Sequence, residues 1–404
     1  MLTRPLRITL LLCTTEILGL AGLATFAALL PTFIRTWHLS NTRAGWLSAV
    51  YYGAYVIAVP LLTAWTDRRD AKRILLCGLV IGAVASLGFA WVATGFWSAL
   101  GLRFLAGIGL AGIYMPGLKL LSDHIEGAGQ SRYVSFYTAS FSLGTSLSFF
   151  LAGEINGALG WRWAFALAGL LTLAGCGMMV ATVPAGKTSR LHHADQAPVS
   201  LRTILGNRQV MAYILAYAAH MWELFSMRSW MVAFFTYSRQ IQATAGPALT
   251  PTQVLALINL IGLPASIGGN ELCRRLGRSR TVRGIMLASA VMSAAVGFST
   301  RLPYFWVVCL GLVYGILVLG DSASLTAGAV ANAPAGSRGT TLAVHSTLGF
   351  GAAFLGPLAV GMVLDMWRGN AGFAWGMAFV CMGAGCALGP LALRLQRHKG
   401  PAQK

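Results

Sequence analysis

Several side chains that can carry charge lie inside long apolar stretches of the sequence. They are Glu16, Arg103, Lys119, His220, Glu223, Arg228, Asp321 and His345. An ionised group costs roughly 3 kcal/mol or more at the centre of a hydrocarbon layer, so each such group is a candidate for function. Carboxyl and imidazole groups can exchange protons, and guanidinium groups bind carboxylates well. The set predicts a polar pathway through an otherwise apolar protein.

The densest group lies in the stretch 209–237. On a helix, Glu223 lies about 60° to one side of His220, and Arg228 lies about 80° to the other side. The three side chains therefore share an arc of about 140°. An acid, an imidazole and a guanidinium on one helix face predict a site that holds a charged solute and carries a proton. The alternative is a structural ion pair of Arg228 with Glu223 or with Glu16.

Glu16 and Glu223 are the candidates for proton coupling. Glu16 has no basic residue close to it within its own apolar stretch. Such a carboxyl group can gain and lose a proton as its surroundings change. A basic partner on a neighbouring helix would instead make Glu16 a structural residue.

The remaining charged candidates differ in what they predict. Arg103 and Lys119 lie about 160° apart on one helix, so they cannot both face one cavity. We assign Arg103 to the pathway, because Lys119 lies near the end of its stretch and can reach lipid headgroups. Asp321 opens a run of polar residues that either lines a vestibule or bonds to a neighbouring helix. His345 is more typical of a helix-packing contact than of a ligand.

Aromatic residues accompany these groups. Tyr51, Tyr52, Tyr55 and Trp230 can touch a solute in the pathway. Tryptophan and tyrosine also anchor membrane interfaces, so their type alone does not assign them.

The composition requires elements that cross a membrane. Of 404 residues, 56% are apolar and only 10% are charged, whereas soluble domains carry about 25% charged residues. The apolar stretches are about as long as a helix that crosses the hydrocarbon layer. We predict an all-α membrane protein with twelve spans. They are 8–34, 44–66, 74–95, 97–122, 133–156, 161–184, 209–237, 251–273, 282–300, 303–330, 339–365 and 371–393.

The basic residues predict the orientation of these spans. With the N-terminus inside, the cytoplasmic segments hold 21 of the 30 Lys and Arg residues, and the outer segments hold six. The positive-inside rule therefore places both termini in the cytoplasm and the chain in the plasma (inner) membrane. The same rule explains the net charge of +19 without a nucleic-acid partner.

The sequence indicates two similar halves joined by a polar linker. Glu16 and Glu223 lie 207 residues apart, and so do Asp67 and Arg274, which each follow a span. The spacing predicts an N-terminal six-helix bundle (1–184), a cytoplasmic linker (185–208) and a C-terminal bundle (209–404). The linker holds His192 and His193, which we interpret as solvated rather than metal-binding. The seven cysteines lie in or beside the spans, so we predict neither a disulfide framework nor a metal site.

Several motifs resemble those of the major facilitator superfamily. The turn Asp67-Arg68-Arg69-Asp70-Ala71-Lys72-Arg73 is a partial match to the loop signature after the second helix of that family. Arg274-Arg275 and Gly277-Arg278 repeat part of it in the second half. Arg103 with Gly107 resembles the Arg motif of the fourth helix. Gly160-Trp161-Arg162-Trp163 is similar to the entry into the sixth helix.

The resemblance implies a monomeric transporter without a cofactor. It implies two six-helix bundles related by a parallel repeat, which rock around a central site. It also implies that Asp67, Arg68, Arg274 and Arg275 act as a cytoplasmic latch. Spans 1, 4, 7 and 10 line the cavity in this family, and these spans hold most of the intramembrane charges.

These features favour a secondary transporter that uses protons to move a small organic solute. The three intramembrane cations favour an organic anion. The rival within the class is a proton-driven multidrug efflux pump, although the Gly-Pro motif of many exporters is missing from span 5. A polytopic membrane enzyme is a remote alternative, because the loops are short and lack paired catalytic acids. Scattered charges in two repeats also argue against a passive channel.

Overall fold

The computed structural model describes residues 4–66, 68–125, 130–183, 201–242, 249–334 and 336–395. In this part of the chain every regular element is helical, which confirms the predicted all-α class. The N-terminal set of helices is α1 (Arg4–Gly19), α2 (Thr25–Ala28), α3 (Leu30–Thr36), α4 (Asn41–Thr66), α5 (Ala71–Val92), α6 (Phe96–His124), α7 (Gln130–Leu159) and α8 (Trp161–Thr182).

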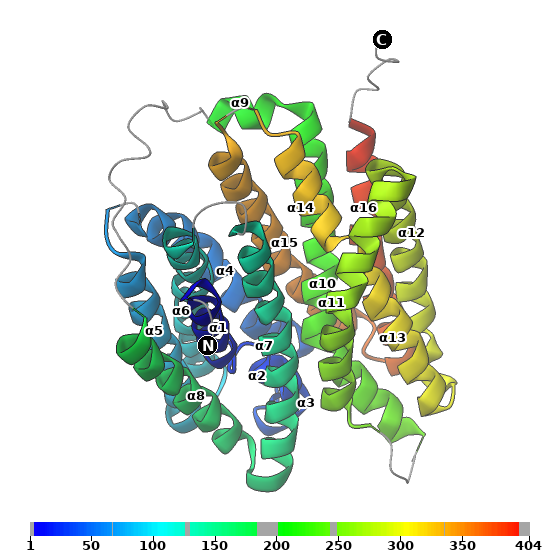
Figure 1. Ribbon diagram of the computed structural model, residues 1–404. Helices are drawn as coiled ribbons and strands as arrows, with labels where there is room; N and C mark the ends of the chain where they lie inside the picture. Colours follow the sequence, from blue (N-terminus) through cyan, green and yellow to red (C-terminus); the bar gives the residue numbers. More distant parts are fainter. Residues whose placement is uncertain are drawn as a thin grey trace.

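The C-terminal set begins with a short helix inside the predicted linker 185–208, whose His192 and His193 lie outside the described residues. Its helices are α9 (Leu201–Gly206), α10 (Arg208–Ile241), α11 (Pro251–Leu276), α12 (Arg278–Gly297), α13 (Tyr304–Gly320), α14 (Ser322–Ala331), α15 (Arg338–Met366) and α16 (Ala371–Ala392), with short 3-10 turns at Ser299–Arg301 and Leu393–Leu395. Figure 1 shows the two sets as neighbouring bundles, the first blue to green and the second green to red.

Each predicted span has a helical counterpart. Eight of the described helical segments are long and apolar enough to cross a membrane, if α13 and α14 are taken together as Tyr304–Ala331. Three of the other counterparts, α7, α10 and α12, are long enough but include more polar residues. The fourth, the predicted span 8–34, is divided among α1, α2 and α3.

The division of the first span has a visible cause. The backbone N–H of Ala24 donates to Ser148 Oγ at 3.0 Å, and Ser148 Oγ donates to the carbonyl of Ala21 at 2.7 Å. A side chain of α7 therefore satisfies the backbone groups that the break leaves free. Backbone groups inside a membrane must find such partners within the protein.

The predicted span 303–330 is also divided. α13 ends at Gly320 and α14 begins at Ser322, so Asp321 lies at the junction of the two helices. Asp321 is 2% exposed, which places a carboxyl group at a buried break in the helix.

The two sets contact each other mainly through two helix pairs. α4 packs on α15, and α7 packs on α11, as Figure 1 shows at the centre of the molecule. We call the end where α4 begins and α15 ends the Asn41 end, and the opposite end the Thr66 end. Hydrogen bonds between the sets join the ends of these helices at the Asn41 end, as between Gln253 and Glu154.

The buried core has the same asymmetry. One cluster combines residues of both sets, including Tyr52 and Tyr55 of α4 with Phe225 and Trp230 of α10. Toward the Thr66 end, the core separates into one cluster within each set. The two sets are therefore joined at the Asn41 end and at mid-length, and they have separate cores at the Thr66 end.

Glycine allows the closest helix packing in the N-terminal set. A Cβ atom at Gly112 of α6 would lie 2.7 Å from the Cα atom of Gly78 of α5. Backbone atoms cannot yield to such a contact, so we expect Gly112→Ala to lower the free energy of unfolding by about 1–3 kcal/mol. Denaturant titration in detergent micelles measures this change.

Gly101 of the same helix is the matched control. Nothing lies within 4 Å of a Cβ atom built there. Gly101→Ala should stabilise the helix by about 0.5–1 kcal/mol, because alanine loses less backbone entropy than glycine. Equal effects of the two substitutions would contradict this packing account.

Candidate functional site

Arg103 of α6 is a buried cation in the N-terminal set. Its side chain is 3% exposed, and its Nε donates to the carbonyl of Leu47 at 3.0 Å. The guanidinium carbon lies 4.3 Å from the centre of the Tyr51 ring and 5.0 Å from that of Phe26. Within the described residues no carboxylate reaches ion-pair distance of this group. Arg103 is therefore held by a carbonyl and aromatic faces and keeps its charge uncompensated by an acid.

Arg228 of α10 is its counterpart in the C-terminal set. It is 6% exposed, its Nε donates to Asn259 Oδ1 at 2.9 Å, and its guanidinium lies 5.3 Å from the centre of the Phe225 ring. The described part of the chain offers it no carboxylate partner either. The alternative of a structural ion pair between Arg228 and Glu223 or Glu16 is not seen among the described residues.

Aromatic side chains connect the two arginines across the boundary between the sets. The Tyr52 ring lies 5.4 Å from the Tyr51 ring and 4.5 Å from the Phe225 ring. One arginine from each set therefore borders the same aromatic cluster.

This arrangement suits an anion. Each Nε donates to the protein, and among the described hydrogen bonds none uses the terminal nitrogens of Arg103 or Arg228. Guanidinium groups bind carboxylates and phosphates with short, charge-assisted hydrogen bonds. Aromatic faces beside them can cover an apolar part of the same solute.

A second polar cluster lies within the C-terminal set. His220 Nδ1 of α10 lies 2.7 Å from Asp321 Oδ1, and both side chains are nearly inaccessible to solvent. The contact has the distance of an ion pair, but its geometry is not that of a hydrogen bond, and Asp321 Oδ1 has no hydrogen-bond partner. His220 Nε2 is likewise buried without a partner.

A second imidazole lies beside this pair. The His345 ring of α15 stacks on Tyr217 at 3.7 Å, and the Tyr217 ring lies 5.8 Å from that of His220. His345 Nε2 is 3.2 Å from Thr326 Oγ1, whereas its Nδ1 is buried without a partner. The interpretation of His345 as a packing residue agrees with its stacked ring.

Glu223 has hydroxyl partners rather than a cation. Its carboxyl group accepts from Ser289 Oγ at 3.0 Å and from the Tyr314 hydroxyl at 3.2 Å. His220, Glu223 and Arg228 therefore have three different sets of partners, although we expected one shared site. The structure brings His220 together with Asp321, and it brings Arg228 to Asn259 and the Phe225 ring.

Glu16 repeats this pattern in the N-terminal set. It is 1% exposed and accepts a hydrogen bond from Ser140 Oγ of α7, while its Oε1 is buried without a partner. Among the described residues it has no basic partner. The structural alternative for Glu16, an ion pair with a neighbouring helix, is therefore not seen in the described part of the chain.

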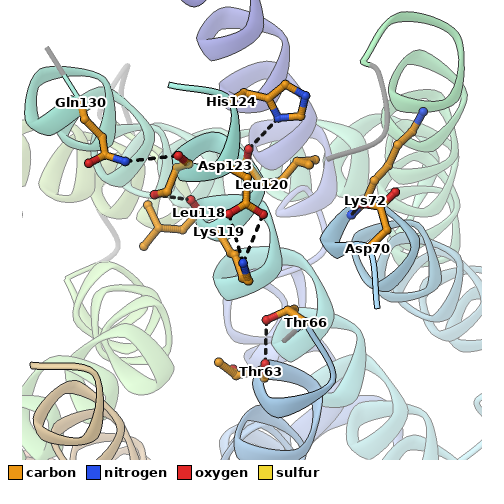
Figure 2. A network of polar contacts seen from close by, with 11 residues as sticks. Thr63, Thr66, Asp70, Lys72, Leu118, Lys119, Leu120, Asp123, His124 and Gln130 are labelled. Atoms are coloured by element: carbon orange, nitrogen blue, oxygen red, sulfur yellow. Dashed lines mark hydrogen bonds and ion pairs between the residues drawn. The ribbon is translucent and has the colours of Figure 1, made fainter. Parts of the chain in front are cut away.

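The remaining predicted residues lie toward the Thr66 end. Lys119 pairs with Asp123 of the same helix at 3.1 Å, and both side chains are partly exposed. Figure 2 shows the two side chains joined by dashed lines. Of the predicted latch, Asp67 lies outside the described residues and Arg68 is exposed. Arg274 and Arg275 pair with Glu271 in their own helix, at 3.1 and 3.0 Å. The described members of the latch thus make no ion pair across the two sets.

Sequence reasoning missed three residues that hold these groups in place. Asn259 orients Arg228, Ser140 bonds to Glu16, and Asp365 of α15 accepts hydrogen bonds from Asn41 of α4. An amide within the apolar run 254–263 was a usable signal for Asn259. Serine is common in membrane helices, so no sequence signal singled out Ser140.

Comparisons with known proteins agree with this architecture. The model of the Major Facilitator Superfamily matches residues 12–357. Protein spinster homolog 1 of Bos taurus is 22% identical over 311 residues, which cover 72% of this chain and 58% of the bovine protein. The matched part of the chain thus spans little more than half of that relative. The niacin transporter NiaP of Acinetobacter baylyi is 21% identical over 298 residues, covering 67% of each protein.

A solved structure shows the same fold. It is that of a bacterial homologue of the human lysosomal transporter spinster, in an inward-facing and occupied conformation. It superposes with a TM-score of 0.74 at 15% identity and covers 97% of this chain and 96% of that one. Because the family model covers most of the sequence, the chain belongs to the Major Facilitator Superfamily, a family of membrane transporters.

Proposed function

We propose that the chain is a secondary transporter that moves a small organic anion by alternating access and couples this movement to protons. The observation that carries the proposal is the pair of buried arginines, Arg103 and Arg228, one from each set of helices. Each lacks a carboxylate partner among the described residues, and both border the cluster of Tyr51, Tyr52 and Phe225.

A buried charge without a partner is unfavourable, so an anion that binds beside it is stabilised. A carboxylate or phosphate that enters between the arginines replaces the hydration they have lost. Because the two groups belong to different sets, one bound anion attracts both sets toward itself. This favours a compact, occupied state, from which the halves can rearrange.

The relatives are consistent with an acidic solute. Niacin, the solute named for NiaP of Acinetobacter baylyi, is an aromatic carboxylic acid. The aromatic cluster beside the arginines offers faces for a ring of this kind. We therefore propose an organic anion with an apolar or aromatic body as the substrate class.

The proposed coupling residues are Glu16, His220, Glu223 and Asp321. Of these, His220 and Asp321 form the one buried acid–base contact in the described residues, at 2.7 Å. Deprotonating the pair leaves a bare carboxylate in an apolar interior, which is unfavourable until water or another partner reaches it. Proton release therefore accompanies a change in the surroundings of the pair, as coupling requires.

We also propose the topology in which this cycle runs. The 21 basic residues of the predicted cytoplasmic segments favour a topology in which both termini, the linker 185–208 and the Thr66 end lie on the cytoplasmic side of the inner membrane. The halves 1–184 and 209–404 then move against each other as a monomer. In this orientation the Asn41 end faces outward, and Asp67, Arg68, Arg274 and Arg275 form a latch when the cytoplasmic side closes.

Transport of matched compounds by purified protein in liposomes tests the substrate class. Nicotinate, its neutral amide nicotinamide, and the hydrophobic cation ethidium are suitable probes, together with a wider panel of aliphatic and aromatic acids. We expect uptake of one or more acids and none of their neutral amides. Transport of ethidium and neutral drugs without any acid would contradict the proposal and favour the multidrug pump.

A further inference from the structure

Asp365 connects the two sets of helices at the Asn41 end. Its Oδ1 accepts from the backbone N–H of Asn41 at 3.0 Å and from Asn41 Nδ2 at 2.9 Å. Its Oδ2 accepts from the backbone N–H of Thr42 at 2.7 Å. Asn41 is the first residue of α4, whereas Asp365 lies at the end of α15 in the other set. One carboxylate therefore caps a helix that belongs to the opposite set.

The chemistry of this contact favours the charged carboxylate. The first N–H groups of a helix have no partner within the helix, and the helix dipole makes this end positive. Hydrogen bonds to an ionised acceptor are roughly twice as strong as those between neutral groups. Asp365 thus supplies, from the other set of helices, the hydrogen-bond acceptor that the N-cap side chain of a helix usually supplies.

The backbones of the two helices meet next to this carboxylate. A Cβ atom at Gly45 of α4 would lie 2.8 Å from the carbonyl oxygen of Pro357 of α15. A Cβ atom at Gly361 of α15 would likewise lie too close to the carbonyl oxygen of Asn41. The cap therefore forms only when α4 and α15 are in full contact, and it is lost as soon as they separate.

A second contact closes the other side of this end. Gln253 Nε2 of α11 donates to Glu154 Oε1 of α7 at 2.8 Å. At the Thr66 end, by contrast, the α4 side chains Ile57, Leu61 and Trp65 are 62%, 62% and 60% exposed. The described hydrogen bonds between the sets thus lie at this end and, from Ser146 Oγ to the carbonyl of Ala256, further inside the same helix pair, and none lies at the Thr66 end.

We propose that Asp365 is the residue that keeps the Asn41 end closed and thereby sets the balance between the two conformations of the transport cycle. Its carboxylate must leave the start of α4 each time this end opens. The role does not depend on the solute or on the coupling ion. It requires only that opening of one end accompanies closure of the other.

Amide hydrogen exchange of the purified full-length protein tests the role without any substrate. In Asp365→Asn, exchange at residues 41–46 should accelerate by about tenfold, because the charged acceptor is lost. Exchange at residues 57–65 and 338–345 should slow at the same time, because the opposite end closes more often. A purely structural cap would change only the first region.

Two further variants make the outcome decisive. Asn41→Ala removes one neutral donor and should give the same two-ended change with a smaller amplitude; it also serves if Asp365→Asn does not fold. Asp123→Asn is the matched control, since Asp123 pairs with Lys119 inside one helix. It should leave exchange at residues 41–46 unchanged. Acceleration confined to residues 41–46, or no change at either end, would overturn the proposal.

Discussion

Arg103→Gln and Arg228→Gln are each expected to lower transport of the organic anion by about thirtyfold or more. The loss of one buried charge pair costs about 2–5 kcal/mol, and every 1.4 kcal/mol is tenfold in affinity. Glutamine keeps a polar side chain of similar length, so the change removes the charge and the forked donor. Initial rates of labelled-anion exchange across liposomes, measured over a range of concentrations, give the effect on KM and on kcat.

The conservative variants separate charge from geometry. Arg103→Lys and Arg228→Lys keep the positive charge but lose the planar fork, so we expect partial activity. Arg162→Gln is the matched control, because Arg162 stacks on Trp161 at 4.4 Å close to the start of α8, far along the chain from either site. Full activity of folded Arg103→Gln and Arg228→Gln proteins would remove the basis of the anion proposal.

Asp321→Asn and His220→Gln are expected to uncouple transport from protons. At one proton per anion and no membrane potential, a gradient of one pH unit drives about tenfold accumulation, since one pH unit is worth about 1.4 kcal/mol. In either variant the accumulation ratio should fall to one, because the 2.7 Å acid–base contact no longer holds a transferable proton. Exchange of labelled for unlabelled anion should persist, because the two arginines remain.

The result distinguishes coupling from binding. His124→Gln is the control, because His124 Nδ1 contacts only a backbone carbonyl of its own helix, at 2.9 Å. If Asp321→Asn still accumulates the anion tenfold, protons are coupled elsewhere, with Glu16 and Glu223 as the next candidates. If exchange is lost as well, then Asp321 belongs to the anion pathway itself.

The spans were predictable from the sequence because their cause is local. A run of apolar residues long enough to cross the membrane must form a helix, and the helices follow the predicted spans closely. The break after Gly19 was not predictable, because Ser148 stabilises it from a helix 124 residues further along the chain. A sequence does not reveal which distant side chain will satisfy a freed backbone group.

The site was only partly predictable, for a geometric reason. Helix angles predict that His220, Glu223 and Arg228 share an arc of about 140° on α10. α10 packs against several helices, including α11, α15 and α16. Two side chains that differ by tens of degrees around the axis of α10 therefore contact different helices. Glu223 meets Ser289 and Tyr314 as a result, whereas Arg228 meets Asn259.

Asp365 was missed because we selected as pathway candidates only the charged residues inside predicted spans. It lies at the end of a predicted span, where a carboxylate can remain hydrated, so its presence there required no explanation. Its three hydrogen bonds to Asn41 and Thr42 arise only when the two sets of helices meet. Contacts that exist in one conformation of a cycle leave no periodic signal in the sequence.

The most direct test of the account is the position of a bound anion. A crystal of the protein soaked with a brominated derivative of an acid that it transports would reveal the bromine by anomalous scattering. We predict a peak beside Tyr52 and Phe225, with the acid group between Arg103 and Arg228. A peak elsewhere, with both guanidinium groups free of the acid, would contradict the central claim.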